Sequence, residues 1–426
     1  MSSTRLNYGK TFLLGFGFFG VSVIWGVYNA FVPIFLADKF GLAPAIIGFF
    51  MTLDNIAALF IQPPVGAWSD KLRTPLGRRI PFILVGAPIT AVAFGLIPIA
   101  AVLPLFVACT STLLLSAALW RTPVVALMPD ITPSEFRSQA NGIINFMGGI
   151  GTIIALQTGG MLYKMSPNFP FWLGSGLVLL AALIVYLFIE EPKEYEKAEE
   201  QPGMIASLKE VFSDKDKSGL RILLAIFFWF LGFSAVETFF TLYAKNHLGL
   251  NEGDGATLLS VLPLFFVLAA IPSGYVAGKL GRKTTISIGL VTITIMLILL
   301  YITPAEALLI GIAPLPLVGI PLVEGGTRML TLAGVLLILG GIGWAFININ
   351  SLPMIVDLTS AARIGTFTGL YYLFSTFSAI VGPNLNGWAV QLTGGNYNII
   401  MLIAPFFMLT AFGLMVGVKK GEAIIN

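Results

Sequence analysis

Thiols and imidazoles are almost absent from this chain of 426 residues. It contains one cysteine, Cys109, and one histidine, His247. A single thiol excludes an internal disulfide, and two isolated side chains provide no Cys/His cluster for a metal ion. The sequence also offers no nucleophile with a credible general base. We therefore predict no enzyme activity, no metal and no cofactor.

A nucleotide-binding loop is also missing. The closest string, GYVAGKLG, has the wrong spacing for a P-loop and no Ser or Thr after its lysine. Nucleotide hydrolysis is therefore excluded as an energy source.

Charged residues make up only 11% of the chain, whereas 57% is hydrophobic. A hydrocarbon layer needs roughly 20 apolar residues per helical span, and such runs recur throughout the sequence. We predict an all-α polytopic membrane protein with twelve spans, at residues 11–37, 44–67, 80–101, 104–128, 138–162, 170–189, 219–243, 255–278, 283–303, 330–354, 363–388 and 397–418. The apolar stretch 305–323 contains several prolines, so we assign it to an outer loop that partly re-enters the membrane or lies on its surface.

The basic residues orient these spans. With both termini inside, nineteen Lys and Arg lie on the inner side and four lie outside. This bias predicts a multi-pass protein of the cell membrane with cytoplasmic termini. The net charge of +3 then reflects topology, and no nucleic-acid partner is implied.

Residues 190–218 form the one long polar segment and divide the spans into six and six. We predict a bundle at 1–189, a cytoplasmic linker at 190–218 containing an interfacial helix (GMIASLKEVF), and a second bundle at 219–426.

The two halves repeat each other. Gly41-Leu42 precedes the second span and Gly249-Leu250 precedes the eighth, a shift of 208 residues that also aligns Pro64 with Pro272. A shift of 227 aligns Asp130 with Asp357 after the fourth and tenth spans. Ordered matches at corresponding helix ends indicate a duplicated six-helix unit, which is how many secondary transporters are built.

The loop GAWSDKLRTPLGRR after the second span resembles the signature loop of the major facilitator superfamily. The resemblance implies that family's fold, two six-helix repeats around a central cavity, and a cytoplasmic gate network of charge-assisted hydrogen bonds. The residues implied for this network are Asp70, Arg78, Arg79, Asp130, Asp357 and Arg363.

The longer run IQPPVGAWSDKLRTPLGRRIPFI is similar to the sucrose/proton symporters and to the glycoside, pentoside and hexuronide:cation symporters. One departure concerns the arginine that plant sucrose symporters carry just after the proline of the fourth helix. This chain has Val125 there, and Arg121 lies one turn earlier. The resemblance therefore implies a sugar, but not sucrose in particular.

Three charged residues lie within predicted spans and away from their ends: Asp54, Arg121 and Glu237. Such charges are costly in a bilayer and should face the protein interior. Under the two shifts, Glu237 corresponds to Asn29 and Arg121 to Asn348, on the four helices that line the cavity in the superfamily. Amides, charged groups and aromatic plates suit a sugar. We expect a substrate site formed by Asn29, Trp25, Arg121, Glu237, Trp344, Asn348, Gln157, Tyr371 and Tyr372.

Energy coupling should come from an ion. An acid in an apolar helix can change its protonation state as the cavity opens to either side. We predict a monomeric proton-coupled sugar symporter that works by alternating access, with Asp54, Glu237 and Arg121 in the coupling site. Sodium is the alternative ion, because Asp54, Asn55 and backbone carbonyls could supply hard oxygen ligands.

Two other functions stay open. A proton-driven exporter of drugs or other amphipathic solutes would resemble antiporters that carry a Gly-Pro motif in the fifth helix. That helix has glycines without the proline, but SAIVGPNLNG occurs in the eleventh. A receptor derived from a transporter would be expected to add a signalling tail beyond Lys420.

Overall fold

The computed structural model describes residues 6–132, 136–191, 208, 211, 213, 216–316, 319–321, 326–358 and 364–419. Its backbone contacts divide the chain into two compact units. Unit 1 comprises Met1–Gly41, Ile56–Lys197 and Glu252–Ser260, and unit 2 comprises Leu42–Asn55, Ala198–Asn251 and Val261–Asn426. Most of the predicted interfacial helix lies outside the described residues.

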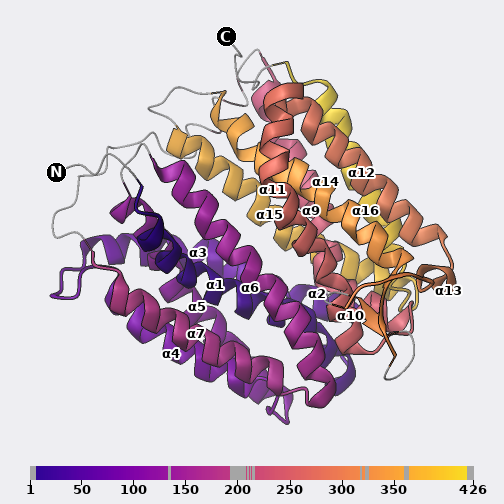
Figure 1. Ribbon diagram of the computed structural model, residues 1–426, viewed down its shortest axis with the longest axis horizontal. Helices are drawn as coiled ribbons and strands as arrows, with labels where there is room; N and C mark the ends of the chain where they lie inside the picture. Colours follow the sequence, from indigo (N-terminus) through magenta and orange to yellow (C-terminus); the bar gives the residue numbers. More distant parts are fainter. Residues whose placement is uncertain are drawn as a thin grey trace. The chain divides into compact units, whose positions relative to one another are not determined.

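The helices of unit 1 run alongside one another (Figure 1). α1 packs on α6 and α7, and α4 packs on α5 and α7. The bounds are α1 (Tyr8–Ile34) with its π-helical extension η1 (Phe35–Lys39), α3 (Leu53–Lys71, in unit 1 from Ile56 onward), α4 (Ile80–Leu96), α5 (Leu103–Ile131), α6 (Arg137–Met165), α7 (Phe169–Phe188) and α10 (Glu252–Leu259).

Unit 2 repeats this packing. α9 packs on α15 and α16, and α12 packs on α14 and α16. The bounds are α2 (Pro44–Phe50), α9 (Ser218–Asn246), α11 (Val261–Leu280), α12 (Arg282–Ile302), α13 (Ala305–Leu308), α14 (Leu332–Val356), α15 (Ile364–Leu392) and α16 (Ile399–Val416). The duplicated arrangement of helices within each unit agrees with the repeat seen in the sequence.

Each of the twelve predicted spans coincides with one helix or with two consecutive ones. Ten stretches of the described residues are long and apolar enough to cross a membrane. The other two predicted spans are α4, which has 17 residues, and α15 (Ile364–Leu392). The expectation of an all-α membrane protein is confirmed for the helical bundles.

Two predicted spans are broken near their first third. The second is divided into α2 and α3 at Met51 and Thr52, and the eighth into α10 and α11 at Ser260. The short segment before each break packs on a helix of the other sequence half, α2 on α15 in unit 2 and α10 on α6 in unit 1. The boundaries predicted from the sequence place α2 in the first bundle (1–189) and α10 in the second (219–426). The backbone contacts instead group α2 with unit 2 and α10 with unit 1, so the two segments are exchanged.

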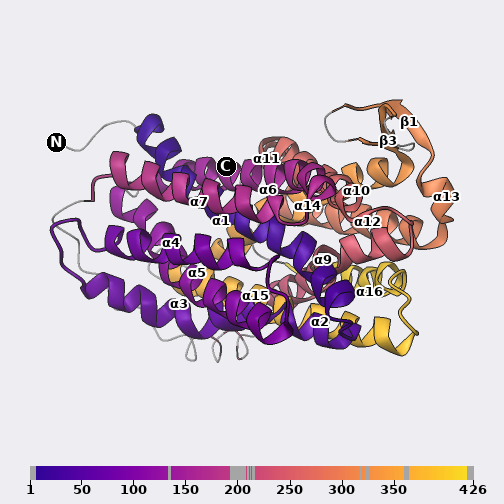
Figure 2. The same ribbon diagram turned by 90° about the horizontal axis from the view of Figure 1, so that it is seen from below.

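The loop after α12 contains a small sheet that the sequence did not predict. β1 (Gly311–Pro314), β3 (Arg328–Thr331) and β2 (Ile320–Pro321) pair antiparallel in that order. β1 and β3 lie beside α13 (Figure 2). Prolines in and between these strands prevent a continuous helix, so the described part of this apolar stretch pairs its backbone groups within the loop.

Candidate functional site

A polar stripe runs along α1. Ser22, Trp25 and Asn29 are half-buried, whereas Val23, Ile24, Val27 and Tyr28 between them are buried. Residues spaced by three and four share one helical face. The face predicted to line a substrate path is therefore the face of α1 that its neighbours in the structure leave accessible.

The equivalent stripe lies on α9. The 208-residue shift places Ser22, Trp25 and Asn29 on Phe230, Phe233 and Glu237. Phe230 and Phe233 are half-buried and Glu237 is exposed, although Ala235, Val236 and Thr238 beside it are buried. The two repeats thus present equivalent faces of equivalent helices. The last residue of the stripe is an amide, Asn29, in α1 and a carboxylate, Glu237, in α9.

Aromatic side chains of unit 2 gather around the α9 stripe. The ring of Phe233 stacks on Trp344 of α14 at 3.7 Å between centroids, and Phe230 meets Trp344 edge-on at 5.2 Å. Tyr371 of α15 contacts Phe230 at 6.1 Å and shares a hydrogen bond of 3.1 Å with Ser351. One face of Trp344 is therefore covered by Phe233 and packs within the unit.

The remaining predicted lining residues differ in accessibility. Arg121 on α5 and Asn348 on α14, which the 227-residue shift relates, are both half-buried. Tyr371 is only 5% exposed, whereas its neighbour Tyr372 is 56% exposed. Tyr371 is thus built into the core of unit 2.

Gln157 is engaged at a helix break. Its Oε1 accepts a hydrogen bond of 3.0 Å from Ser260 Oγ, at the junction of α10 and α11. Asp54 lies at the other break, in the first turn of α3, and accepts a hydrogen bond of 2.9 Å from the Asn55 side chain. Two predicted site residues are therefore associated with the broken spans.

The loop between α3 and α4 holds a network of ion pairs within unit 1. Asp130 Oδ1 lies 2.5 Å from Arg78 Nη2, and Asp130 Oδ2 lies 2.9 Å from Arg79 Nε. Asp70 Oδ1 lies 2.5 Å from Arg79 Nη2 and 3.8 Å from Arg78 Nη1. The structure brings these four predicted residues together at the ends of three helices.

The sequence prediction missed a fifth member of this network. The Glu191 carboxylate accepts hydrogen bonds from the backbone N–H groups of Arg78, Arg79 and Ile80, at 2.9, 2.7 and 2.7 Å. These are orphan donors at the start of α4, and the helix dipole favours a negative charge there. Gly77 has φ +100°, and a Cβ on it would lie 2.5 Å from Glu191 Cδ.

The second repeat forms a smaller network. Asp357 pairs with Arg282, which follows Gly281 as Arg78 follows Gly77. Lys283 donates to the carbonyl oxygens of Val416 and Val418 at 2.9 and 2.8 Å, near the end of α16. Arg363, predicted as a gate residue, lies outside the described residues.

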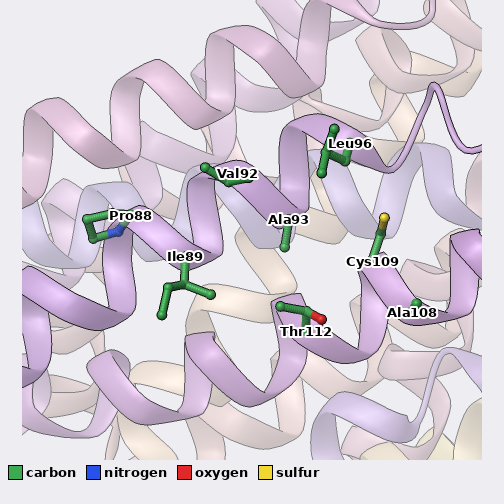
Figure 3. Close-up of a pocket in the computed structure, with 8 residues that line it drawn as sticks. All are labelled: Pro88, Ile89, Val92, Ala93, Leu96, Ala108, Cys109 and Thr112. Atoms are coloured by element: carbon green, nitrogen blue, oxygen red, sulfur yellow. The ribbon is translucent and has the colours of Figure 1, made fainter.

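A cavity of about 430 Å³ lies between α4 and α5 (Figure 3). Its lining is apolar apart from Cys109 and Thr112, and it includes the exposed side chains of Ile89 and Val92. None of the predicted site residues lines it. Its chemistry suits hydrocarbon rather than a polar substrate.

A family model described as Major Facilitator Superfamily matches residues 14–383. Among curated proteins, Multidrug resistance protein 2 of Bacillus subtilis (strain 168) is 24% identical over 93% of this chain and 91% of its own length. Multidrug resistance protein 1 of the same strain is 25% identical over 53% of this chain, and the match spans 56% of that protein. Quinolone resistance protein NorA of Staphylococcus aureus is 23% identical over 58% of this chain and 61% of its own length.

Two solved structures share the fold. A bacterial homolog of the human lysosomal transporter Spinster, inward-facing and unoccupied, has a TM-score of 0.74 at 14% identity, covering 100% of both chains. The nucleoside transporter NupG has a TM-score of 0.69 at 16% identity, covering 97% of this chain and 100% of its own.

Proposed function

The chain belongs to the Major Facilitator Superfamily, and on that premise we propose that this membrane transporter is proton-coupled and carries an amphipathic organic solute out of the cell. In this proposal, the bundles at 1–189 and 219–426 alternate access around the α1 and α9 stripes, and both termini are cytoplasmic. The observation that carries the proposal is the α9 stripe: two phenylalanines lead to an exposed carboxylate, Glu237, within a span.

The chemistry of the stripes supports the substrate class. Phe230 and Phe233 offer apolar contact area, supported from behind by Trp344, which is 6% exposed, and Glu237 offers a charge that attracts an organic cation. The names of three relatives refer to resistance against drugs or quinolones. In the proposal Glu237 binds the cationic solute, and a proton released from Asp54 in exchange for the solute gives antiport.

Sugar symport is the second candidate, and the α1 stripe favours it. Ser22, Trp25 and Asn29 present a hydroxyl, an indole and an amide on one accessible face. This combination suits sugar hydroxyls and the apolar face of a sugar ring.

Counterflow in proteoliposomes separates the two candidates. Labelled mono- and disaccharides and a labelled hydrophobic organic cation would be tested with internal pH monitored. We expect exchange of the cation with proton movement, and loss of that exchange in Glu237→Gln. Exchange of a sugar without exchange of the cation would overturn the exporter proposal in favour of the symporter.

Coupling is tested with Asp54→Asn. In the proposal Asp54 carries the proton, so this variant should still exchange substrate in counterflow but should not accumulate it against a gradient. Phe60→Leu, at a residue 69% exposed on the apolar surface of α3, is the matched control. Accumulation driven by an imposed proton gradient in Asp54→Asn would exclude Asp54 as the coupling site.

A further inference from the structure

The two helix breaks are equivalent under the repeat. The 208-residue shift places Thr52 on Ser260, and each hydroxyl donates to the carbonyl oxygen three residues earlier, Phe49 at 2.7 Å and Thr257 at 2.6 Å. The backbone N–H groups differ: that of Thr52 donates to the Phe49 carbonyl oxygen at 3.0 Å, three residues earlier, whereas that of Ser260 is shared between Ala256 at 3.1 Å and Thr257 at 3.2 Å.

The same two hydroxyls are held by equivalent partners. Asn384 of α15 donates to Thr52 Oγ1 at 3.2 Å, and the side-chain amide of Gln157 of α6 lies 3.0 Å from Ser260 Oγ. The 227-residue shift places Gln157 on Asn384. Each break is thus fastened by an amide on the helix against which its short segment packs.

The glycines beside these partners are also equivalent. A Cβ on Gly160 of α6 would lie 2.4 Å from the carbonyl oxygen of Gly253 in α10. A Cβ on Gly387 of α15 would lie 2.5 Å from that of Pro44 in α2. Both short segments are therefore seated at backbone contact distance.

The cause of the break differs between the repeats. In the second repeat Pro263 is the third residue of α11, and a proline cannot donate the backbone hydrogen bond that would join α11 to α10. The equivalent residue in the first repeat is Asn55, which has its N–H, and Asp54 takes the place of Leu262. The second break is fixed by covalent structure, whereas the first depends on side chains.

The helix after the break is also packed more tightly in the second repeat (α11) than in the first (α3). α11 packs on α14, where Gly341 lies so close that a Cβ on it would be 2.4 Å from the Leu262 carbonyl oxygen. The equivalent of Gly341 on α5 is Leu114. Among the described residues α3 makes no comparably extensive contact with α5. It buries Val65 and Ser69 alone, whereas α11 buries five side chains.

We propose that the junction of α2 and α3 is a hinge controlled by the proton on Asp54, whereas the junction of α10 and α11 is a permanent bend. A carboxylate in the first turn of α3 is favoured by the N–H groups and dipole of a helix that starts there. The neutral acid loses this advantage, and because residue 55 is not proline, α2 and α3 then join into one helix. The hinge rests on the proposed role of Asp54 in coupling and specifies how protonation moves α3.

Other charged and titratable groups lie on the helices around this junction, and Arg121 of α5 belongs to the coupling site predicted for Asp54. α15, which packs on α2, has no charged residue and two titratable ones, Tyr371 and Tyr372. On α3 the other charged residues are Asp70 and Lys71, at its opposite end. α9 also packs on α15 and carries Arg221, Glu237 and Lys245.

Amide hydrogen exchange of the full chain in nanodiscs tests the hinge. A peptide covering residues 51–56 reports the first junction, and one covering residues 260–264 is the internal reference. In Asp54→Leu, exchange of the first peptide should slow by about tenfold or more relative to the reference, because the helix becomes continuous. The pair Asp54→Leu with Asn55→Pro reproduces the second repeat and should restore fast exchange.

The pH response completes the test. In the unsubstituted protein, the ratio of first-peptide to reference exchange should fall between pD 8 and pD 5, and in Asp54→Leu/Asn55→Pro it should stay constant. A ratio that does not change with pD in the unsubstituted protein would overturn the hinge, and so would slow exchange of the first peptide in Asp54→Leu/Asn55→Pro. Asp54→Asn gives a second reading with a side chain of nearly the same shape, in case the leucine variant does not fold.

Failure of the hinge is distinguishable from failure of the proposed function. If no solute is transported but the ratio still responds to pD through Asp54, the hinge stands and the transport proposal falls. If Asp54→Asn abolishes accumulation but the exchange ratio of the two peptides changes neither with pD nor with the substitution, the coupling role stands and the hinge falls.

Discussion

Asp130→Asn should destabilise unit 1 far more than Asp70→Asn, although both carboxylates pair with Arg78 and Arg79. The Asp130 side chain is 11% exposed, and its arginine partners are 12% and 5% exposed. Asp70 is 54% exposed. Removing one partner of a buried pair costs about 3–5 kcal/mol, whereas an exposed pair contributes about 1 kcal/mol or less.

The difference is large enough to measure as a melting temperature. Because asparagine keeps one acceptor oxygen, we use the lower figure of about 3 kcal/mol for Asp130→Asn. At about 2–4 °C per kcal/mol for a domain of 150–250 residues, the expected shift is about 6–12 °C. Asp70→Asn should shift the midpoint by no more than about 4 °C.

The single thiol provides the assay. Cys109 lies on α5, the helix that also carries Asp130, and is 7% exposed. After brief heating at graded temperatures, a polyethylene-glycol maleimide would label only molecules in which α5 has opened, and the gel shift gives the midpoint. Equal midpoints for the two variants, or a lower one for Asp70→Asn, would refute the burial argument.

Three further predictions follow from single contacts. The Asp254 side chain is 5% exposed and its partner Lys164 is 33% exposed. Lys164→Met should therefore lower the melting midpoint more than Asp254→Asn, since it leaves the more buried charge without this partner; the reverse order would contradict this assignment. Burial lowers the pKa of His247 from 6.5, so the stability that its neutral form supports is present above about pH 6.5 and lost as pH falls through the lowered value. Melting of His247→Asn should consequently depend less on acid than that of the parent, and equal acid sensitivity would exclude this. Gly160→Ala should cost about 1–3 kcal/mol through overpacking, whereas Gly176→Ala, with nothing within 4 Å, should leave the midpoint unchanged in the same thermal assay.

Helix positions could be predicted from the sequence because hydropathy and span length depend only on the order of residues along the chain. The break at Met51 and Thr52 could not, since neither proline nor glycine marks it. Pro263 marks the equivalent break in the second repeat, so the 208-residue shift is the signal that could have located both. The sheet after α12 was missed because its strands have only two to four residues and include prolines.

The loop network shows a similar division. Asp70, Arg78, Arg79 and Asp130 were found because their spacing follows a family motif and repeats. Glu191 is one acid among several in the polar segment after α7, and only folding brings it to the start of α4. Arg282 could have been found by aligning Gly77-Arg78 with Gly281-Arg282.

Lining residues are the least predictable part. Periodicity identified the accessible face of α1, and the repeat carries that face onto α9. It did not reveal that Phe233 covers one face of Trp344, because the partner of an aromatic ring is set by packing between helices. Substrate identity depends on such contacts and stays a proposal.

The exchange of short segments sets an order of events during synthesis. α10 leaves the ribosome when its partner α6 already exists, so that contact can form at once. α2 must wait for α15, which is synthesised roughly 300 residues later; at about 5–20 residues per second this takes about 15–60 s. Throughout that time the surface of α2 around Gly48, which approaches the Pro383 carbonyl in the finished protein, has only lipid or a chaperone to cover it. The contacts of α2 with α15 and of α10 with α6 are equivalent in the folded protein, but they form at different times during synthesis. α2, which is made first, is the segment that stays longest without its partner helix.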